Sequence, residues 1–257
     1  MGRLGNQMFI IAATHSLAID NGVIAVFPSR VSGVTPAEKE SFIHRQTILR
    51  NVLYDEDLSF VKGVYRQDQD FSFSPIPYQD GVCLIGYFQS EKYFLHNRDE
   101  ILKLFSPPKP LEDFISRKYS KIIGNNRYVS VHIRRGDYLL PKFSGHHTNL
   151  GREYYQKAMS HFPDDSTFVF FSDDIEWCKQ TFGKKNSFFV ENTNDVIDMY
   201  LMSKIPNNII ANSSFSWWGA WLNINDDKKV IRPKNWFGPL NSHLITKDLT
   251  PEEWVVI

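Results

Sequence analysis

The second half of the chain alternates between short apolar runs and stretches of helical periodicity. Runs rich in β-branched and aromatic residues predict strands, and apolar residues three or four positions apart predict helices. We expect strands over 128–135, 167–172, 187–190, 208–211 and 228–232. We expect helices over 152–162, 175–182, 195–204 and 215–223. Strands and helices in alternation predict a parallel sheet with helices on both faces.

The first half carries a weaker pattern, with one clear amphipathic stretch near its start and a long polar region after it. Asn21-Gly22 is a typical helix end, and Pro-rich or acidic stretches are typical of loops. We expect helices over 6–20 and 93–105, strands over 23–27 and 82–88, and loops with short helices over 28–79.

The string S-P-P-K-P at 106–110 separates the two halves. Prolines this close together interrupt regular structure and are typical of a domain boundary. A chain of 257 residues is long enough for two small domains. We therefore predict an N-terminal domain over 1–110 and a C-terminal domain over 111–257.

Composition narrows the class of protein. The chain has 29 basic and 29 acidic residues, so bulk charge does not favour binding to nucleic acid or to an anionic membrane. Its two cysteines, Cys83 and Cys178, lie far apart and in no metal-like spacing, which favours a reducing compartment. The sequence shows neither a cleavable signal pattern nor an apolar run long enough to span a membrane.

The string H-I-R-R-G-D-Y at 132–138 ends the first predicted strand of the second half. Because side chains alternate along a strand, we expect His132 and Arg134 on one face and Arg135 on the other. Guanidinium groups match phosphate oxygens, and charges near a buried strand are costly without a partner. The string predicts a phosphate site, with Asp137 as a partner that fixes one arginine.

Two further strings follow strands of the same sheet. In F-S-D-D at 171–174, Asp173 and Asp174 are suited to bind a nucleoside or to cap the next helix. In A-N-S-S at 211–214, Asn212, Ser213 and Ser214 can donate to a pyrophosphate at a helix N-terminus. Ligands of open parallel sheets bind beyond the carboxyl ends of strands, where all these residues fall.

The string G-R-L-G-N-Q at 2–7 precedes the first predicted helix. Its glycines allow the backbone to approach a ligand, and the helix N-terminus offers free N–H groups. The alternative is an ordinary loop in which Asn6 caps the helix.

Metal-binding patterns are weak. The triplets Asp55-Glu-Asp57 and Asp68-Gln-Asp70 lie in polar stretches and do not follow a buried strand, so we interpret them as solvated charges. The pair His146-His147 has no third ligand in sequence reach. We predict no metal site and no cofactor.

Together these strings resemble the α-1,2-fucosyltransferases of glycosyltransferase family 11. The matching stretches are G-R-L-G-N-Q-M-F at 2–9, H-I-R-R-G-D-Y at 132–138, F-S-D-D at 171–174 and A-N-S-S-F-S-W-W-G-A-W-L at 211–222. The resemblance covers nearly the whole chain. Members of that family usually begin with a short apolar strand; here only Met1 precedes Gly2, so we expect the N-terminal sheet to lack that strand.

The resemblance implies an α/β, GT-B-like fold of two facing Rossmann-like domains with mostly parallel sheets. It implies a galactoside α-1,2-L-fucosyltransferase that uses GDP-L-fucose, inverts the anomeric centre and needs no metal. Arg134 would grip the diphosphate, with His132 and Asp137 shaping that site. The remaining donor-binding residues would be Arg3, Gly5, Asn6, Gln7, Arg135, Asp173, Asp174, Asn212, Ser213 and Ser214.

The general base stays open among Asp137, His132 and an acid of the N-terminal half. Asp137 lies next to two arginines and is expected to be a weak base, whereas His132 is expected to stay neutral. Two other functions also stay open: a non-catalytic or truncated nucleotide-sugar-binding module, and a metal-dependent transferase that uses another nucleotide sugar. The acceptor is expected to be a galactose-terminated glycan, and the location cytoplasmic in a bacterium, at or near the inner membrane face.

Overall fold

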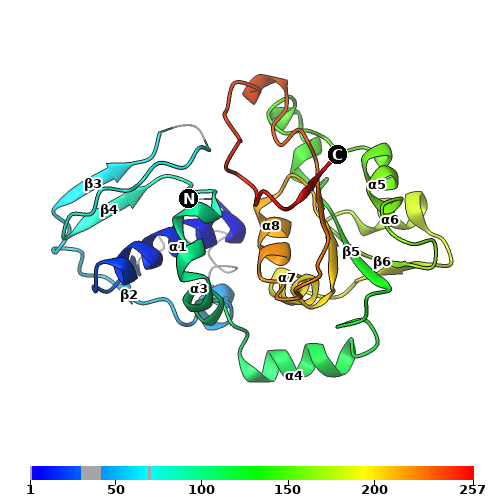
Figure 1. The fold of residues 1–257 in the computed structure, drawn as a ribbon, viewed down its shortest axis with the longest axis horizontal. Coiled ribbons are helices and arrows are strands. Elements are labelled where there is room, and N and C mark those ends of the chain that lie inside the picture. Colours follow the sequence, from blue (N-terminus) through cyan, green and yellow to red (C-terminus); the bar gives the residue numbers. More distant parts are fainter. Residues whose placement is uncertain (1, 30–41, 69–70) are drawn as a thin grey trace. The chain divides into compact units, whose positions relative to one another are not determined.

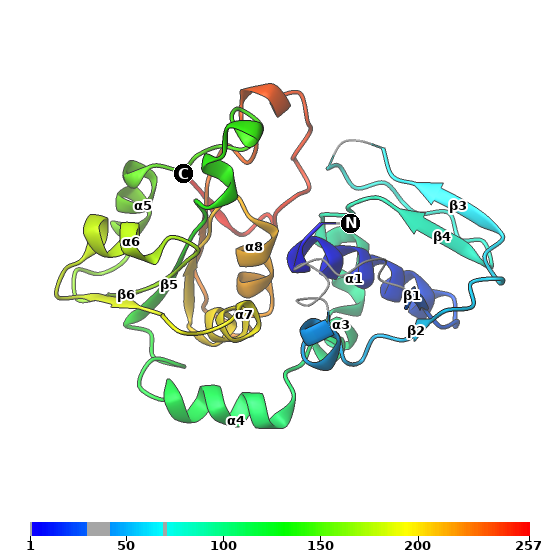
Figure 2. The same ribbon diagram turned by 180° about the vertical axis from the view of Figure 1, so that it is seen from behind.

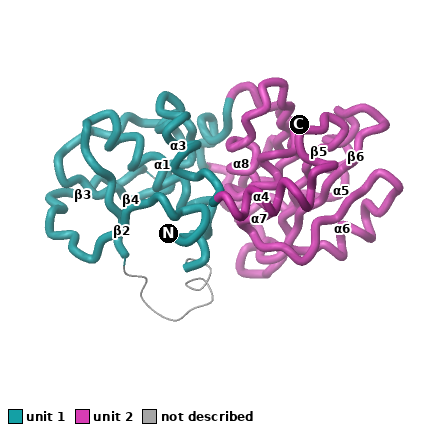
Figure 3. The backbone as a smooth tube through the Cα atoms, turned by 90° about the horizontal axis from the view of Figure 1, so that it is seen from below, with its two compact units in different colours: residues 1–108, 244–251 teal, residues 109–243, 252–257 magenta. Residues whose placement is uncertain are grey.

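The structure is a computed structural model that describes residues 2–29, 42–68 and 71–257 (Figure 1). The chain divides into two compact units (Figure 3). Unit 1 comprises Met1–Pro108 and Leu244–Pro251, and unit 2 comprises Lys109–His243 and Glu252–Ile257. The first crossing between units lies two residues before the predicted boundary. The return of residues 244–251 to unit 1 was not predicted.

Unit 2 is built on a sheet of six strands, all paired in parallel. Their order in the sheet is β10-β9-β8-β5-β6-β7. The bounds are β5 Tyr128–Ile133, β6 Thr167–Ser172, β7 Ser187–Phe189, β8 Asn207–Ile209, β9 Val230–Arg232 and β10 Val255–Val256.

The strand order reverses between β5 and β8. From β5 the chain adds β6 and β7 toward one edge, and then β8, β9 and β10 toward the other. In doubly wound sheets, ligands bind beyond the carboxyl ends of the strands at such a reversal. The segments that follow β5 and β8 are the predicted phosphate-binding strings. Topology alone thus places H-I-R-R-G-D-Y and A-N-S-S next to each other.

Helices cover both faces of the unit 2 sheet, with α5 and α6 on one face and α7 and α8 on the other (Figure 2). Their bounds are α5 Arg152–Met159, α6 Ile175–Phe182, α7 Asp195–Lys204 and α8 Ser214–Trp221. The helix α4, Lys109–Lys118, opens the unit. Short 3-10 helices lie at Asp137–Leu139, Pro141–Phe143 and Pro239–Asn241.

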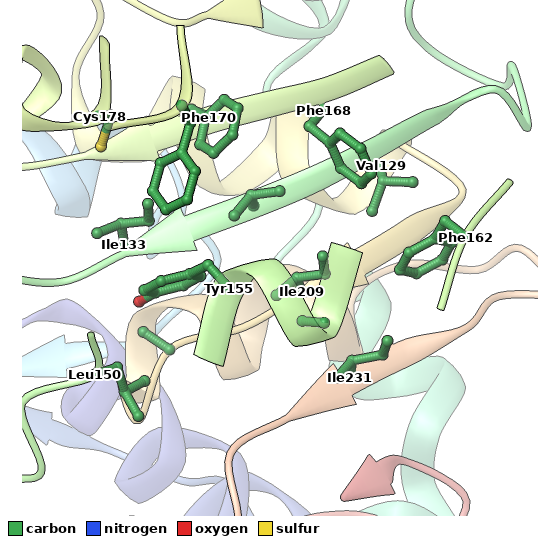
Figure 4. Packing of buried hydrophobic residues seen from close by; sticks show 14 residues of the cluster. Val129, Ile133, Leu150, Tyr155, Phe162, Phe168, Phe170, Cys178, Ile209 and Ile231 are labelled. Carbon is green, nitrogen blue, oxygen red and sulfur yellow. The ribbon is translucent and has the colours of Figure 1, made fainter. Parts of the chain in front are cut away.

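The core under α5 and α6 explains why this face forms (Figure 4). Val129, Val131 and Ile133 alternate along β5 and are fully buried. They pack in one cluster with Tyr155 of α5 and Cys178 of α6. The period of two along the strand therefore assigns the odd-numbered residues of β5 to this side, and Ser130 and His132 to the side of α7 and α8.

Most predicted elements of unit 2 are confirmed. The strand over 167–172 and the helices over 175–182 and 195–204 match from end to end. The other predicted strands and helices form with ends shifted by one to three residues. One α-helix and one strand were missed: α4, which has a proline at its second residue, and the two-residue strand β10. Proline is tolerated in the first helical turn, so the predicted breaker lies inside a helix.

Unit 1 has one long helix and short strands. Its helices include α1 Leu4–Asp20 and α3 Arg98–Leu104, with 3-10 turns at Glu91–Tyr93 and Leu95–Asn97. Residues 42–46 are also helical, in the stretch where short helices were expected. Two parallel pairs of strands are present in its described residues. The pairs are β1 Phe27–Pro28 with β2 Tyr54–Asp55, and β3 Gly63–Arg66 with β4 Val82–Ile85.

Several expectations for the first half were wrong. The run 23–27 does not form a buried strand: only its last residue belongs to β1, and Ile24 is 78% exposed. The strand β3 lies where loops and short helices were expected. The predicted helix over 93–105 begins only at Arg98, after two separate 3-10 turns. A strand needs a neighbour to pair with, and this information is absent from a local pattern.

Candidate functional site

The register of β5 and β6 brings Arg134 alongside Asp173. Ile133 is paired with Ser172, so the next residue of each strand leaves the sheet at the same level. The guanidinium Nη1 of Arg134 lies 2.9 Å from Asp173 Oδ2. Two strings that are far apart in sequence thus form one site, because parallel strands end at the same edge of the sheet.

Arg134 is held on two sides by carboxylates. Besides Asp173, its Nη2 donates to Asp137 Oδ1 at 2.6 Å. The guanidinium carbon also lies 5.7 Å from the centre of the Tyr138 ring. The side chain is 16% exposed, so a guanidinium group is fixed near the surface of the sheet edge rather than fully buried. The prediction that Asp137 fixes one arginine is consistent with this ion pair.

Arg135 turns toward α6. Its Nε donates to Asp174 Oδ2 at 3.0 Å, and its guanidinium carbon lies 4.0 Å from the centre of a Trp177 ring. Its backbone N–H donates to Asp173 Oδ1 at 2.9 Å. The guanidinium groups of Arg134 and Arg135 therefore pair with different acids of the F-S-D-D string.

Asp174 also caps α6, as the capping alternative predicted. Its Oδ1 accepts a hydrogen bond from the backbone N–H of Trp177 at 3.2 Å, which satisfies one of the unpaired donors of the first turn. The Asp174 N–H itself donates to Ser172 Oγ at 2.9 Å. One carboxylate thus starts a helix and orients an arginine.

His132 is buried on the face of β5 that packs against α7 and α8. Its ring lies 5.3 Å from that of Phe215, and Nδ1 has no hydrogen-bond partner among the described residues. Burial lowers the pKa of His132 to about 3, and the nearby charge of Arg134 acts in the same direction. The ring is neutral at physiological pH, and a group with so low a pKa is a weak base.

The A-N-S-S turn follows β8 at the reversal point. Asn212 is 1% exposed, and its amide nitrogen donates to the carbonyls of Thr148 and Trp236 at 2.9 and 2.8 Å. Ser213 is the N-cap of α8 and accepts from the Phe215 N–H. The Asn212 side chain therefore joins two loops, while Ser213 and Ser214 stand at the helix N-terminus.

The aromatic residues after this turn are core residues. Trp217, Trp218 and Trp221 are all buried, and the Trp217 and Trp221 rings stack with their centres 6.1 Å apart. Trp217 also packs against Trp254, at 5.6 Å between ring centres. Trp217 therefore fills the layer between α8 and the C-terminal segment and does not line the strand-end site.

The predicted donor residues of unit 1 lie at the start of α1. This helix begins at Leu4 with Arg3 as its N-cap, so Gly5, Asn6 and Gln7 are in its first turn. The expected loop up to residue 5 and the alternative of Asn6 as N-cap were both wrong. Asn6 Oδ1 instead accepts from Gln89 Nε2 at 2.9 Å, and Gln7 Nε2 donates to the Gly2 carbonyl at 3.1 Å.

Two residues of the site were not predicted from sequence. Tyr138 contacts Arg134, and Trp177 contacts Arg135. The position of Tyr138 directly after the arginine string was a usable signal. Trp177 lies in the first turn of a predicted amphipathic helix, so nothing in the local pattern separated it from the core.

Within residues 2–29, 42–68 and 71–257, no three His, Cys, Asp or Glu side chains gather closely enough to hold a metal ion. Asp55 and Asp57 accept backbone N–H groups within their own turn, at 3.0 and 2.8 Å, and Asp70 lies outside the described residues. No helix in the described part of the chain is long and apolar enough to cross a membrane.

Comparison with curated proteins finds three informative relatives. The O-antigen biosynthesis glycosyltransferase WbnK of Escherichia coli is 41% identical over 66% of this chain and 60% of its own length. An α-1,2-colitosyltransferase of Escherichia coli is 34% identical over 86% of this chain and 78% of its own length. Galactoside α-(1,2)-fucosyltransferase 2 of Oryctolagus cuniculus is 28% identical over 100% of this chain and 75% of its own length.

Among solved structures, the apo form of POFUT1 matches 90% of this chain and 95% of that chain, with a TM-score of 0.50 and 10% identity. At that identity the match is evidence for the fold alone, and it confirms the predicted α/β, GT-B-like class. The match to WbnK spans less than two thirds of that protein. The family model of glycosyl transferase family 11 matches residues 1–257. The chain therefore belongs to glycosyl transferase family 11.

Proposed function

We propose that the chain transfers L-fucose from GDP-L-fucose to the 2-hydroxyl of a galactoside, with inversion and without a metal ion. The observation that carries the proposal is Arg134, held between Asp137 and Asp173 at the strand reversal. Family membership and the α-1,2 linkage named for two of its relatives support it. Donor-binding roles for the other residues named from sequence are part of the same proposal.

The departure of GDP requires positive charge that is already in place. Arg134 presents a fixed guanidinium, and the N-terminus of α8 presents backbone N–H groups and the positive end of the helix dipole. Both stand where the strand order reverses, after β5 and β8. In the proposal they share the diphosphate, with Ser213 and Ser214 as additional hydroxyl donors.

The sugar develops positive charge as the bond to GDP breaks. The carboxylates of Asp137 and Asp173 beside Arg134 favour that charge and keep the site from becoming strongly cationic. Proton removal from the acceptor hydroxyl needs a positioned base. The burial and low pKa of His132 argue against this residue as the base. The remaining candidates for the base are Asp137 and an acid of residues 1–110.

The donor sugar has a second candidate. The relative that is 34% identical is an α-1,2-colitosyltransferase. Colitose differs from L-fucose by the absence of the 3-hydroxyl, so the two donors share the same reacting centre. A pocket built to hydrogen-bond the 3-hydroxyl rejects the deoxy sugar strongly, whereas an apolar pocket discriminates weakly.

The test is a transfer assay read by mass spectrometry. The chain is incubated with galactose-terminated acceptors and either GDP-L-fucose or GDP-colitose, with and without EDTA. We expect EDTA-resistant transfer from GDP-L-fucose and a product that an α-1,2-fucosidase cleaves. Loss of transfer in EDTA contradicts the metal-independent mechanism, and preference for GDP-colitose establishes the second candidate. GDP binding without turnover on any acceptor favours a binding module. The cytoplasmic location near the inner membrane stays a prediction.

A further inference from the structure

Tyr138 links Arg134 to two other parts of unit 2. Its hydroxyl donates to the carbonyl of Asn212 at 3.0 Å. Its ring stacks on the His147 ring, with centres 4.2 Å apart and planes 4° from parallel. The Arg134 guanidinium carbon lies 5.7 Å from the centre of the same Tyr138 ring. One side chain therefore contacts the arginine, the turn after β8 and the loop after β5.

His147 provides a fixed surface for this ring. Its backbone forms an antiparallel bridge with Phe237, and the hydroxyl of Thr148 donates to the Phe237 carbonyl at 2.8 Å. Asn212 Nδ2 donates to the Thr148 carbonyl at 2.9 Å. These contacts form a closed circuit that runs from Tyr138 through His147, Thr148 and Asn212 back to Tyr138.

The charge state of His147 is compatible with a position near Arg134. Burial lowers the pKa of His147, and the neighbouring charges of His146 and Arg134 act in the same direction, against the opposing effect of Asp137. A neutral imidazole does not repel the guanidinium group. Tyr138 thus presents the negative face of an aromatic ring toward Arg134 from a neutral support.

We propose that Tyr138, supported by His147, is a positioning residue that holds Arg134 in the orientation required for the leaving diphosphate. The kinetic part of this inference rests on the proposed function; the orientation of Arg134 does not. The contact with the Tyr138 ring differs from the ion pairs in that it uses none of the guanidinium N–H groups of Arg134. When a diphosphate takes N–H groups from Asp137 and Asp173, the contact with Tyr138 persists.

The kinetic test compares three variants. Tyr138→Leu removes the ring and the hydroxyl, and Tyr138→Phe removes the hydroxyl alone. Tyr154→Phe is the matched control, because its hydroxyl donates to the Ile210 carbonyl at 2.6 Å, two residues before Asn212. We expect kcat to fall about 100-fold in Tyr138→Leu, as for a misplaced catalytic group, and about fivefold in Tyr138→Phe. The control is expected to keep kcat within about twofold.

A second measurement follows Arg134 directly. The Nε–Hε signal of its guanidinium is assigned by its loss in Arg134→Lys and recorded by NMR in every variant. We expect a narrow, slowly exchanging signal in the wild type and in Tyr154→Phe, and a broadened one in Tyr138→Leu. A narrow signal in Tyr138→Leu overturns the inference. A broadened signal in a protein that transfers no GDP-linked sugar supports the positioning and rejects the proposed function.

Discussion

Asp173 shapes the arginine turn with both of its carboxylate oxygens. Oδ1 accepts from the Arg135 N–H and Oδ2 pairs with Arg134. The same side chain explains the glycine of the string: a Cβ at Gly136 would lie 2.5 Å from Asp173 Oδ2. A larger residue at position 136 would therefore have to displace the Asp173 carboxylate from its place beside Arg134.

We predict that Asp173→Asn reduces kcat strongly and stability slightly. The amide oxygen still accepts from the Arg135 N–H, but the ion pair with Arg134 is lost. Loss of one charged hydrogen bond near the surface corresponds to about 1–2 kcal/mol in the free energy of unfolding. Asp174→Asn is a comparison and not a neutral control: asparagine also caps helices and the Arg134 pairs remain, but the ion pair with Arg135 is lost. Equal kcat losses in both variants would contradict the special role of Asp173.

Two buried groups of unit 2 give opposite pH dependences. Burial and Arg134 lower the pKa of His132 to about 3 from 6.5, so its stabilising contribution is complete above pH 6.5 and is lost as pH falls toward 3. Burial raises the pKa of Asp198 to about 6 from 3.8, so its contribution is complete below pH 3.8 and is lost as pH rises through 6. Between about pH 4 and 6 the two effects oppose each other.

Substitution of His132 and substitution of Asp198 should therefore change the pH dependence of the free energy of unfolding in opposite directions. We predict that His132→Gln makes the free energy of unfolding fall as pH rises from about 4 to 6, and that Asp198→Asn makes it fall as pH decreases over the same range. Each slope change is at most about 1.4 kcal/mol per pH unit, the value for one proton. Urea unfolding at several pH values measures it, and parallel profiles for the two variants would refute the assignment.

At the scale of elements, α8 carries the A-N-S-S turn and depends on close packing with α7. Gly219 is the residue of α8 that faces α7: a Cβ there would lie 3.0 Å from both Cβ and Cε of Met202. Asn208, at the start of the same strand-to-turn segment, donates to the Met202 carbonyl at 2.9 Å. The position of the turn is therefore tied to the α7–α8 contact.

We predict that Gly219→Ala destabilises unit 2 by about 1–3 kcal/mol, the usual cost of overpacking a core. Combination with Met202→Ala removes Sδ and Cε from the contact, so the cost of Gly219→Ala should be smaller in that background. Thermal unfolding of the four proteins in this cycle measures the difference. Additive losses would show that the two residues do not compete for space.

The elements also show what the sequence could predict. The segments 167–172, 175–182 and 195–204 were found from end to end. The first is a continuous apolar run that is buried on both faces of the sheet, and the two helices carry buried residues three or four positions apart. The run 23–27 has the composition of a strand but little pairing, and composition cannot reveal a missing neighbour. The sequence placed the polar strings at strand ends, yet the Arg134–Asp173 pair depends on register, which no single segment encodes.

At the scale of the whole molecule, the C-terminal segment belongs to both units. Residues 244–251 are anchored in unit 1, where Asp248 accepts from the Phe73 N–H at 2.8 Å and pairs with Lys92 at 2.7 Å. The last residues return to unit 2, where β10 pairs with β9 and Trp254 is buried against Trp217. The final six residues thus give unit 2 a buried tryptophan and an edge strand.

We predict that deletion of residues 252–257 destabilises unit 2 severely. The deletion removes a buried tryptophan, whose loss alone costs about 3–5 kcal/mol, and it also removes the edge strand β10. Trp254→Phe is the milder comparison, because it keeps an aromatic ring at the same place. Hydrogen exchange, followed separately for peptides of each unit, should show the loss of protection in 128–232. Equal loss in residues 4–20 would contradict an effect centred on unit 2.

The path of the chain has a consequence for limited proteolysis. The backbone passes between the units at 108/109, 243/244 and 251/252. A single cut at any one of these points leaves two covalent connections between the halves. Fragments seen on a denaturing gel would then show where the protease reaches the backbone, but they would not show that one unit has separated from the other. Release of unit 2 as an autonomous fragment requires cuts at all three crossings, and the fragment must then retain its detached final strand by non-covalent contacts alone.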